Sequence, residues 1–370
     1  MLDDDEPLPS GHPSIVPRFG AHVTPDDRPL SRRPASFRRL RLSTTLGAAV
    51  VAVTTTAILA GFHTELRPVT PAEEGGTRSE LVTTDIVGIR TFTPPPGITV
   101  DSDVVYGTQA DGALLTLDVC SPPADAARAA DVEPSLRPAV ISIHGGSWAR
   151  GDKANSDWRG VCQWLASAGF VAYSVNYRLA PAAQFPAAID DLTVAVEWIR
   201  EADNVRKYGI DPDRIGVLGG SAGGNLAALL GARGTGSLAE GSRVAAVATL
   251  SAPTDLRHES LRRADAPEGL HRIVLSYLGC SVRRDCEAED AASPITELDV
   301  SDPPVFIGAS TGEFIPLSQS TGYASRLAEL DIPHQLVTVP GSLHSIGILD
   351  EAMRTSVADF LHSHLSSPAS

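Results

Sequence analysis

The segment that most constrains the fold is RIGVLGGSAGGNLAALL, at residues 214–230. A β-branched run ends at Gly219, Ser221 follows, and small and apolar residues typical of a helix begin at once. A strand that turns directly into a helix leaves no room for side chains, which explains glycine at 219 and 223 in the pattern G-x-S-x-G. The pattern predicts that the turn holds the Ser221 hydroxyl outward, at the positive end of a helix. We therefore expect Ser221 to be a nucleophile, the alternative being a serine that only caps a glycine-rich helix.

Short β-branched runs alternate with longer helical stretches on both sides of this segment. The expected strands lie at 114–122, 139–146, 171–178, 214–220, 244–252, 304–310 and 334–341, and the expected helices at 156–168, 186–208, 320–330 and 352–365, with one more from Ser221. This alternation predicts an α/β fold in which a mainly parallel sheet is covered by helices on both faces, with ligands at the carboxyl ends of the strands. Residues 255–300 are irregular and are expected to form an insertion or lid that shapes the pocket.

A second glycine-containing motif, ISIHGGSWARGDK, begins in an earlier predicted strand. Glycines at 145 and 146 expose backbone N–H groups, which can stabilise an oxyanion that develops on a substrate carbonyl. We expect the N–H groups of Gly145, Gly146 and Ala222 to form this oxyanion hole. His144 is expected to hold the loop in place rather than to react.

Several motifs in order carry a family resemblance: HGGSW with GDK, VNYRLAP, FPAAIDDLTVAVEWIRE, YGIDPDRIGVLGGSAGGNLAALL and PGSLHS. Over residues 100–365 the chain resembles the BD-FAE and hormone-sensitive-lipase-like carboxylesterases of the α/β-hydrolase superfamily. The resemblance implies an α/β-hydrolase fold and hydrolysis of a small-molecule, lipid or polysaccharide ester without a metal or organic cofactor. Ser147 departs from it, because many relatives have a third glycine there. The HGGxW form also resembles the arylformamidase branch, so formamide or amide hydrolysis is an alternative activity.

The general base is expected to be His344, in VPGSLHSIG after the last predicted strand, where the superfamily places its catalytic histidine. A neutral imidazole can take the proton of the serine hydroxyl and return it to the leaving group. The expected mechanism is an acyl-enzyme on Ser221 that water resolves.

The acid is harder to assign, because the loop ASTGEFIPLSQS has no aspartate where relatives have one. Counting forward from Pro304, before the preceding strand, puts Glu313 at the acid position, whereas counting back from Pro316, after the loop, puts Gly312 there. The spacing of the lipase branch of the family would put Ile315 there. We expect Glu313 to be the acid, since a glutamate can also orient an imidazole. Asp255 is the best substitute. If the loop has lost its acid, the alternatives are a severely slowed enzyme and a catalytically silent, membrane-tethered hydrolase fold used for binding.

The sequence before the predicted domain divides into three parts. Residues 1–42 are rich in proline and charge and are expected to be a disordered cytoplasmic tail. Residues 43–62 carry no formal charge and are long enough for one transmembrane helix, a signal-anchor. Residues 63–99 are expected to be a linker, and residues 100–366 the catalytic domain.

Arginines precede the apolar segment, at 32, 33, 38, 39 and 41. By the positive-inside rule they orient a single-pass protein with its catalytic domain outside the cytoplasm. The alternative is an export signal cleaved near Ala60, after which the domain would be secreted.

Charge and cysteine content exclude other classes of function. A formal net charge of -15, without a basic patch in the domain, argues against nucleic-acid binding. The cysteines are Cys120, Cys162, Cys280 and Cys286, and no histidine stands close enough to them to suggest a zinc site. Export would favour disulfides, and Cys280 with Cys286 is the preferred pair, although the spacing leaves the connectivity open.

Overall fold

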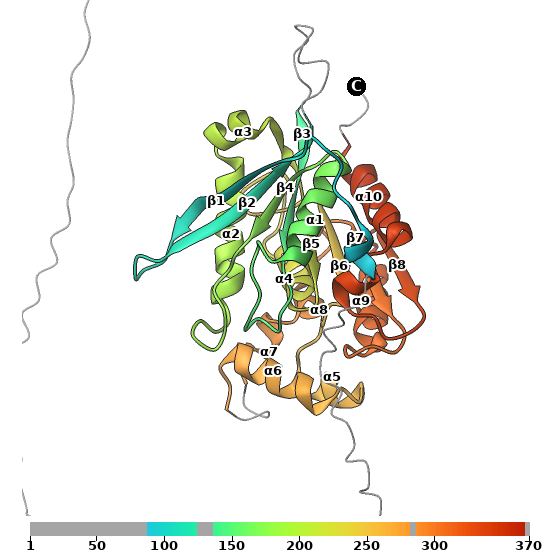
Figure 1. Cartoon of the computed structure of the whole chain (residues 1–370). Coiled ribbons are helices and arrows are strands. Elements are labelled where there is room, and N and C mark those ends of the chain that lie inside the picture. Colours follow the sequence, from blue (N-terminus) through green and yellow to red (C-terminus); the bar gives the residue numbers. More distant parts are fainter. Residues whose placement is uncertain (1–86, 124–135, 282–285, 367–370) are drawn as a thin grey trace, which may run out of the picture. The chain divides into compact units, whose positions relative to one another are not determined.

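The computed structural model describes residues 87–123, 136–281 and 286–366. Within these residues one eight-stranded sheet has the order β1-β2-β4-β3-β5-β6-β7-β8 (Figure 1). β2 is antiparallel to both of its neighbours, and every other pair is parallel. The strands are β1 Thr99–Thr108, β2 Leu114–Ser121, β3 Arg137–Ile143, β4 Val171–Val175, β5 Ile210–Gly220, β6 Ala246–Leu250, β7 Val305–Ser310 and β8 His334–Val339. The predicted mainly parallel sheet is confirmed.

Helices follow most of the parallel strands, as the alternation predicts. They are α1 Ser156–Ser167, α2 Ala187–Arg200, α3 Ala202–Tyr208, α4 Ala222–Ala232, α5 His258–Arg263, α6 Glu268–Leu278, α7 Ala288–Ala291, α8 Pro294–Glu297, α9 Leu317–Glu329 and α10 Glu351–Leu365, with 3-10 turns η1 Gly88–Thr91 and η3 Ser345–Ile348. The segment predicted as one helix at 186–208 is two helices, because the backbone turns to an extended conformation at Glu201 (ψ 136°).

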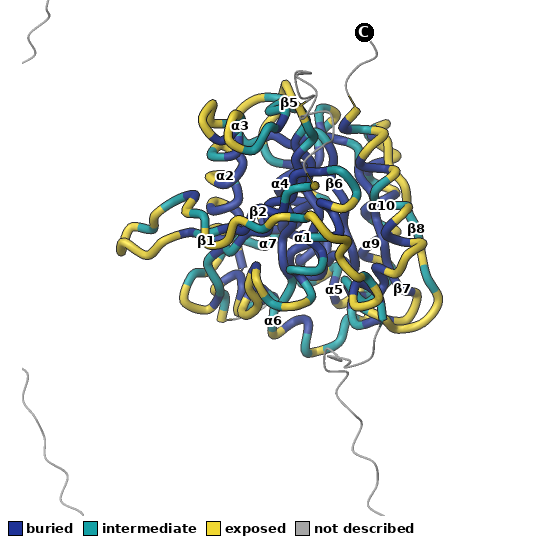
Figure 2. The backbone as a smooth tube through the Cα atoms, turned by 45° about the horizontal axis from the view of Figure 1, so that its top comes forward, coloured by how far each residue is buried: buried dark blue, intermediate teal, exposed yellow. Residues whose placement is uncertain are grey.

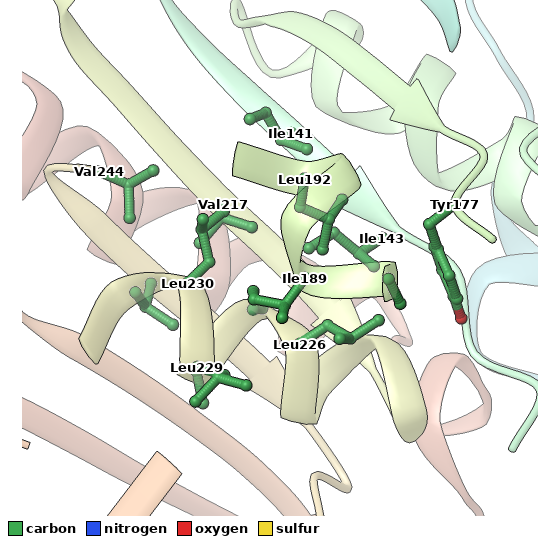
Figure 3. Packing of buried hydrophobic residues seen from close by; sticks show 14 of the residues in the cluster. Ile141, Ile143, Tyr177, Ile189, Leu192, Val217, Leu226, Leu229, Leu230 and Val244 are labelled. Atoms are coloured by element: carbon green, nitrogen blue, oxygen red, sulfur yellow. The ribbon is translucent and has the colours of Figure 1, made fainter. Parts of the chain in front are cut away.

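The core lies on both faces of the sheet. Along β3, Ile141 and Ile143 belong to a buried cluster that also contains residues of α2, α4 and α9. Val140 belongs to a second cluster, with residues of α1 and α10. This alternation follows from the two-residue period of a strand. Figure 3 shows the first of these layers, with α2 and α4 side chains against the strands, and in Figure 2 the central strands are buried while the turn between β1 and β2 is exposed. The sheet is therefore a rigid platform whose strand ends can carry a site.

The folded unit begins earlier than the expected boundary at Val100. Ile89 in η1 is 2% exposed and belongs to the core cluster of α1 and α10. Gly88 adopts φ +55°, and a side chain there would lie 2.1 Å from the carbonyl oxygen of Ile346. The turn at residues 88–91 thus packs on the domain, because Ile89 is buried and Gly88 lies against the segment that follows β8, whereas residues 93–97 are exposed. β1 is a further strand that the sequence analysis missed.

Two disulfides are present in the described part of the chain. Cys120 of β2 is bonded to Cys162 of α1, and Cys280 is bonded to Cys286. The preferred pair is confirmed, and the other two cysteines form a second bond. The predicted tail 1–42 and transmembrane segment 43–62 lie outside the described residues; among those described, no helix is both long and apolar enough to span a bilayer.

Candidate active site

Ser221 stands at the turn between β5 and α4. Its backbone has φ 55° and ψ −123°, a strained conformation for a residue with a side chain. The turn is possible because residue 223 is glycine, since a Cβ there would lie 2.1 Å from the carbonyl oxygen of Ile143. The Ser221 N–H donates to the carbonyl of Leu250 at the end of β6 (2.8 Å), which fixes the turn against the neighbouring strand. The side chain is therefore held at the carboxyl edge of the sheet, as predicted.

The loop after β3 lies against this turn. A Cβ on Gly145 would be 3.3 Å from the Cβ of Ser221, so the two backbones approach closely only because residue 145 is glycine. Within the described residues the N–H groups of Gly145 and Gly146 have no acceptor in the protein. Ala222 is the first residue of α4, where an N–H has no partner within the helix. The three predicted donors are thus brought beside Ser221. Ser147, which replaces a glycine of many relatives, keeps a positive φ of 56°.

His144 supports this loop, which agrees with its expected structural role. Its ring stacks on Tyr177 with centroids 4.3 Å apart, and its Nδ1 is 2.8 Å from the carbonyl oxygen of Gly145. The Tyr177 hydroxyl donates to the His144 carbonyl (2.9 Å). Burial lowers the pKa of His144, so the ring is held in its neutral form.

His344 lies between β8 and η3, and both of its ring nitrogens are informative. Nδ1 is hydrogen-bonded to the Oε2 atom of Glu313. Nε2 is buried and has no hydrogen-bond partner within the described residues. A bond from Nδ1 to a carboxylate leaves Nε2 as the nitrogen that can accept a proton. His344 and Ser221 line the same pocket.

Glu313 is held by several donors after β7. Its side chain is 1% exposed, and Oε1 accepts hydrogen bonds from the Ser251 hydroxyl (2.8 Å) and the Ser310 N–H (3.0 Å). The substitute acid, Asp255, instead forms an ion pair with Arg257 (2.7 Å). Of the candidate carboxylates, Glu313 is the one that reaches the His344 ring.

The two other registers of this loop place residues without a carboxylate at the acid position. The N–H of Gly312 donates to the carbonyl of Gly341 (2.8 Å), and Ile315 is a buried apolar residue of the core. Only the forward count from the preceding strand therefore matches the geometry.

The pocket at Ser221 has a volume of about 380 Å³, and its walls differ from those expected. It is lined by η1 and the residue before it, by the loop after β3, by the start of α1, and by the segment after His344. None of its lining residues comes from the described part of 255–300, so the expectation that this insertion shapes the pocket is wrong for this cavity. The insertion instead contacts the loop after β3, since the ring of Tyr277 in α6 stacks on that of Trp148 with centroids 4.3 Å apart.

Sequence reasoning missed the pocket wall made by the N-terminal turn. Val87 and Ile89 line the cavity together with Trp158 and Ile346. Arg90 is bound to Asp157 of α1 through two hydrogen bonds of 2.8 and 2.7 Å. The apolar run IVGI at residues 86–89 is the signal that could have indicated a buried segment.

A buried ion pair below the loop was also missed. Lys153, the lysine of GDK, donates to Asp118 of β2 (2.6 Å), and the two side chains are 4% and 0% exposed. Asp118 also binds Arg159 of α1 and accepts from the N–H of Asp103 (2.9 Å). Lys153 is tied to β4 as well, because its carbonyl accepts from the Ser174 hydroxyl (3.0 Å). These contacts anchor the far end of the loop that carries Gly145 and Gly146, two of the predicted oxyanion donors.

Comparison with known proteins agrees with this geometry. Residues 127–327 match the BD-FAE family, a span that contains the nucleophile turn and Glu313. The chain belongs to the BD-FAE family. The BD-FAE match is more than half of the chain and confirms the α/β-hydrolase resemblance stated from the motifs.

Individual relatives of this BD-FAE chain are esterases by name. Esterase LipC of Mycobacterium tuberculosis is 32% identical over 62% of this chain and 58% of its own, and Esterase LipQ of the same organism is 28% identical over 70% and 61%. The chain thus spans about three fifths of each. Among solved structures, an esterase of Pyrobaculum calidifontis has a TM-score of 0.57 and 26% identity over 72% of this chain and 85% of its own.

Proposed function

We propose that the protein is a serine hydrolase that cleaves carboxylic esters through an acyl-enzyme on Ser221. The single observation that carries the proposal is the arrangement at His344, which lines the same pocket as Ser221. Its Nδ1 is bonded to Glu313, while its buried Nε2 has no partner in the described part of the chain. An imidazole so oriented by a carboxylate is equipped to remove the serine proton. The family and the named esterases support the same activity.

In the proposed reaction His344 takes the hydroxyl proton as Ser221 Oγ attacks the ester carbonyl. The carbonyl oxygen becomes an oxyanion, and the N–H groups of Gly145, Gly146 and Ala222 donate to it. His344 then gives the proton to the leaving alcohol, and water attacks the acyl-enzyme in a second step that repeats the proton transfers. Glu313 orients the imidazole and stabilises its cationic form.

The pocket supports a preference for small acyl groups. Its volume of about 380 Å³ is near the lower end of the range of ~300–1,000 Å³ for ligand sites. Its apolar surfaces come from Val87, Ile89, Trp158 and Ile346. We propose that the acyl group enters this cavity, whereas the alcohol part, from a small molecule, a lipid or a polysaccharide, extends outside it.

The experiment is labelling of the purified protein with a fluorophosphonate probe together with hydrolysis of p-nitrophenyl esters. Ser221→Ala should abolish labelling, and Ser325→Ala, at an exposed serine of α9, should not change it. Glu313→Gln should lower kcat about 10³–10⁴-fold, whereas Glu329→Gln at the exposed end of α9 should not. Labelling that persists in Ser221→Ala refutes the nucleophile, and an unlabelled wild type indicates a silent binding module. Faster turnover of N-formylkynurenine than of any ester would favour the amidase alternative.

We also propose that the domain works outside the cytoplasm, held to the membrane by residues 43–62. The two disulfides support an oxidising compartment, since such bonds are rare in a reducing cytosol. Protease treatment of intact cells should digest the domain only if it is outside. A cleaved signal would instead release a shorter, soluble protein into the medium, which mass spectrometry distinguishes from an anchored chain.

A further inference from the structure

Ser251, at the end of β6, touches both the proposed acid and the segment that carries the proposed base. Its hydroxyl lies 2.8 Å from the Oε1 atom of Glu313 and 2.8 Å from the backbone nitrogen of Ser345, the residue after His344. The side chain is buried, with the residue 1% exposed. One hydroxyl therefore links three chain segments, which follow β6, β7 and β8.

The direction of these hydrogen bonds follows from the donors present. The N–H of Ser345 can only donate, so the Ser251 oxygen accepts from it and the single hydroxyl hydrogen is left for Glu313. The Ser310 N–H also donates to Oε1 (3.0 Å). Because both donors meet the same carboxylate oxygen, Oε2 remains for the Nδ1 atom of His344.

The backbone of Ser251 is strained in a way that keeps the hydroxyl in this place. It adopts φ +54°, which is rare for a residue with a side chain. Its N–H donates to the carbonyl of Gly308 in β7 (2.7 Å). Residues held in such conformations cluster at functional sites, where the surrounding structure imposes them.

Glutamate needs such a support more than aspartate does. It has one more rotatable bond, so more side-chain freedom must be lost before the carboxylate is fixed. In this chain the acid loop carries a glutamate and no aspartate, and the longer side chain of Glu313 reaches between Ser251 and His344. The hydroxyl of Ser251 can restrict that side chain to the one rotamer that faces the imidazole.

We propose that Ser251 is a positioning residue that acts through Glu313 and that makes a glutamate effective as the acid of this site. The inference rests on the proposed function and deepens it. Ser251 itself does not contact substrate, since it does not line the pocket at Ser221. Its effect should therefore fall on kcat rather than on substrate binding.

The test uses the purified full chain and p-nitrophenyl acetate. Ser251→Ala should lower kcat about 10–100-fold, as for other residues that orient a catalytic group, with KM changed less than about twofold. In a Glu313→Gln background the same change should cost less than about threefold, because no carboxylate remains to be positioned. Ser142→Ala is the matched control, since Ser142 of β3 is also a buried serine but its hydroxyl has no partner within the described residues.

Ser251→Gly separates the hydroxyl from the backbone strain, because glycine adopts positive φ without cost. Its kcat should fall to the same extent as that of Ser251→Ala, and its melting temperature should be at least as high as that of Ser251→Ala. A kcat restored by glycine, an equal loss in both Glu313 backgrounds, or an effect on KM alone would overturn the inference. If the wild type hydrolyses no ester and takes no fluorophosphonate label, the proposed function fails and the inference fails with it. An active wild type with an unaffected Ser251→Ala refutes the inference alone.

Discussion

Replacing Asp118 with alanine should destabilise the protein and weaken the loop that carries Gly145 and Gly146, two of the proposed oxyanion donors. Asp118 is fully buried and binds Lys153 Nζ at 2.6 Å, and it also binds the guanidinium of Arg159. Without it, the buried Lys153 keeps only Asp103, whose side chain is 79% exposed. A buried cation would thus lose its buried partner.

The magnitude follows from the burial of the two partners. Removing one member of a buried ion pair costs about 3–5 kcal/mol, because the other charge is left uncompensated. Asp103 remains to bind Lys153, and Arg159 is 25% exposed and can be hydrated. We therefore expect the free energy of unfolding to fall by about 3 kcal/mol, at the low end of that range.

Urea denaturation followed by tryptophan fluorescence measures this loss. With a slope of about 3 kcal/mol/M, the midpoint should fall by about 1 M. Asp203→Ala is the control, because Asp203 pairs with Arg206 and both side chains are more than two thirds exposed, at 87% and 71%. Exposed pairs contribute less than about 1 kcal/mol, so this midpoint should hardly move.

The pH dependence provides a second measurement. Burial alone would lower the pKa of Lys153, but its hydrogen bonds to Asp103 and Asp118 outweigh burial and raise the pKa above the ordinary 10.5. A raised pKa in the folded state contributes stability below pH ~10.5 that is lost as the pH rises through the folded value. The urea midpoint of the wild type should fall more steeply above pH ~10.5 than that of Asp118→Ala. Equal midpoints for wild type and variant at pH 7, or parallel pH profiles, would refute the reasoning.

Three other perturbations test the nucleophile turn, the pocket wall and a disulfide. Gly223→Ala should prevent folding or lower the free energy of unfolding by at least ~3 kcal/mol, since its Cβ would lie 2.1 Å from a β3 carbonyl oxygen. In a thermal melt the control Gly322→Ala in α9, whose Cβ would have nothing within 4 Å, should be neutral or slightly stabilising. Ile89→Ala should enlarge the pocket and shift the preferred p-nitrophenyl ester toward longer acyl chains, and an unchanged chain-length profile would contradict the placement of η1 in its wall. Replacing both Cys120 and Cys162, which are 42 residues apart, with alanine should lower the free energy of unfolding by about 4 kcal/mol, measured by urea denaturation under non-reducing conditions.

Features set by neighbours in the chain could be predicted from the sequence. The strand, turn and helix around Ser221 are consecutive in the sequence. Glycine at 219 and 223 indicates a turn without room for side chains at these two positions. The strand and helix alternation likewise predicts a parallel sheet, because helical crossovers are what join parallel strands. The position of His344 after the last strand followed from the order of motifs.

Features set by segments far apart in the sequence required the structure. The acid loop allowed Glu313, Gly312 or Ile315 at the acid position, and the choice depends on where a carboxylate meets an imidazole 31 residues away. The role proposed for Ser251 likewise required the structure, because Ser251 is hydrogen-bonded to Ser345, which is 94 residues away in the sequence.

The Ser221 pocket is the clearest case of a feature that only the tertiary structure decided. The sequence by itself determined that a serine would stand where a strand turns directly into a helix, because that depends on local backbone geometry. It pointed to residues 255–300 for the pocket wall, whereas the wall comes from η1, α1 and the segment after β8. The hydrophobic effect favours burial of an apolar residue such as Ile89 but does not specify its partner. The partner therefore depends on which surface the folded chain places next to it. For that reason the sequence identifies the proposed nucleophile, and the packing of distant segments forms the pocket around it.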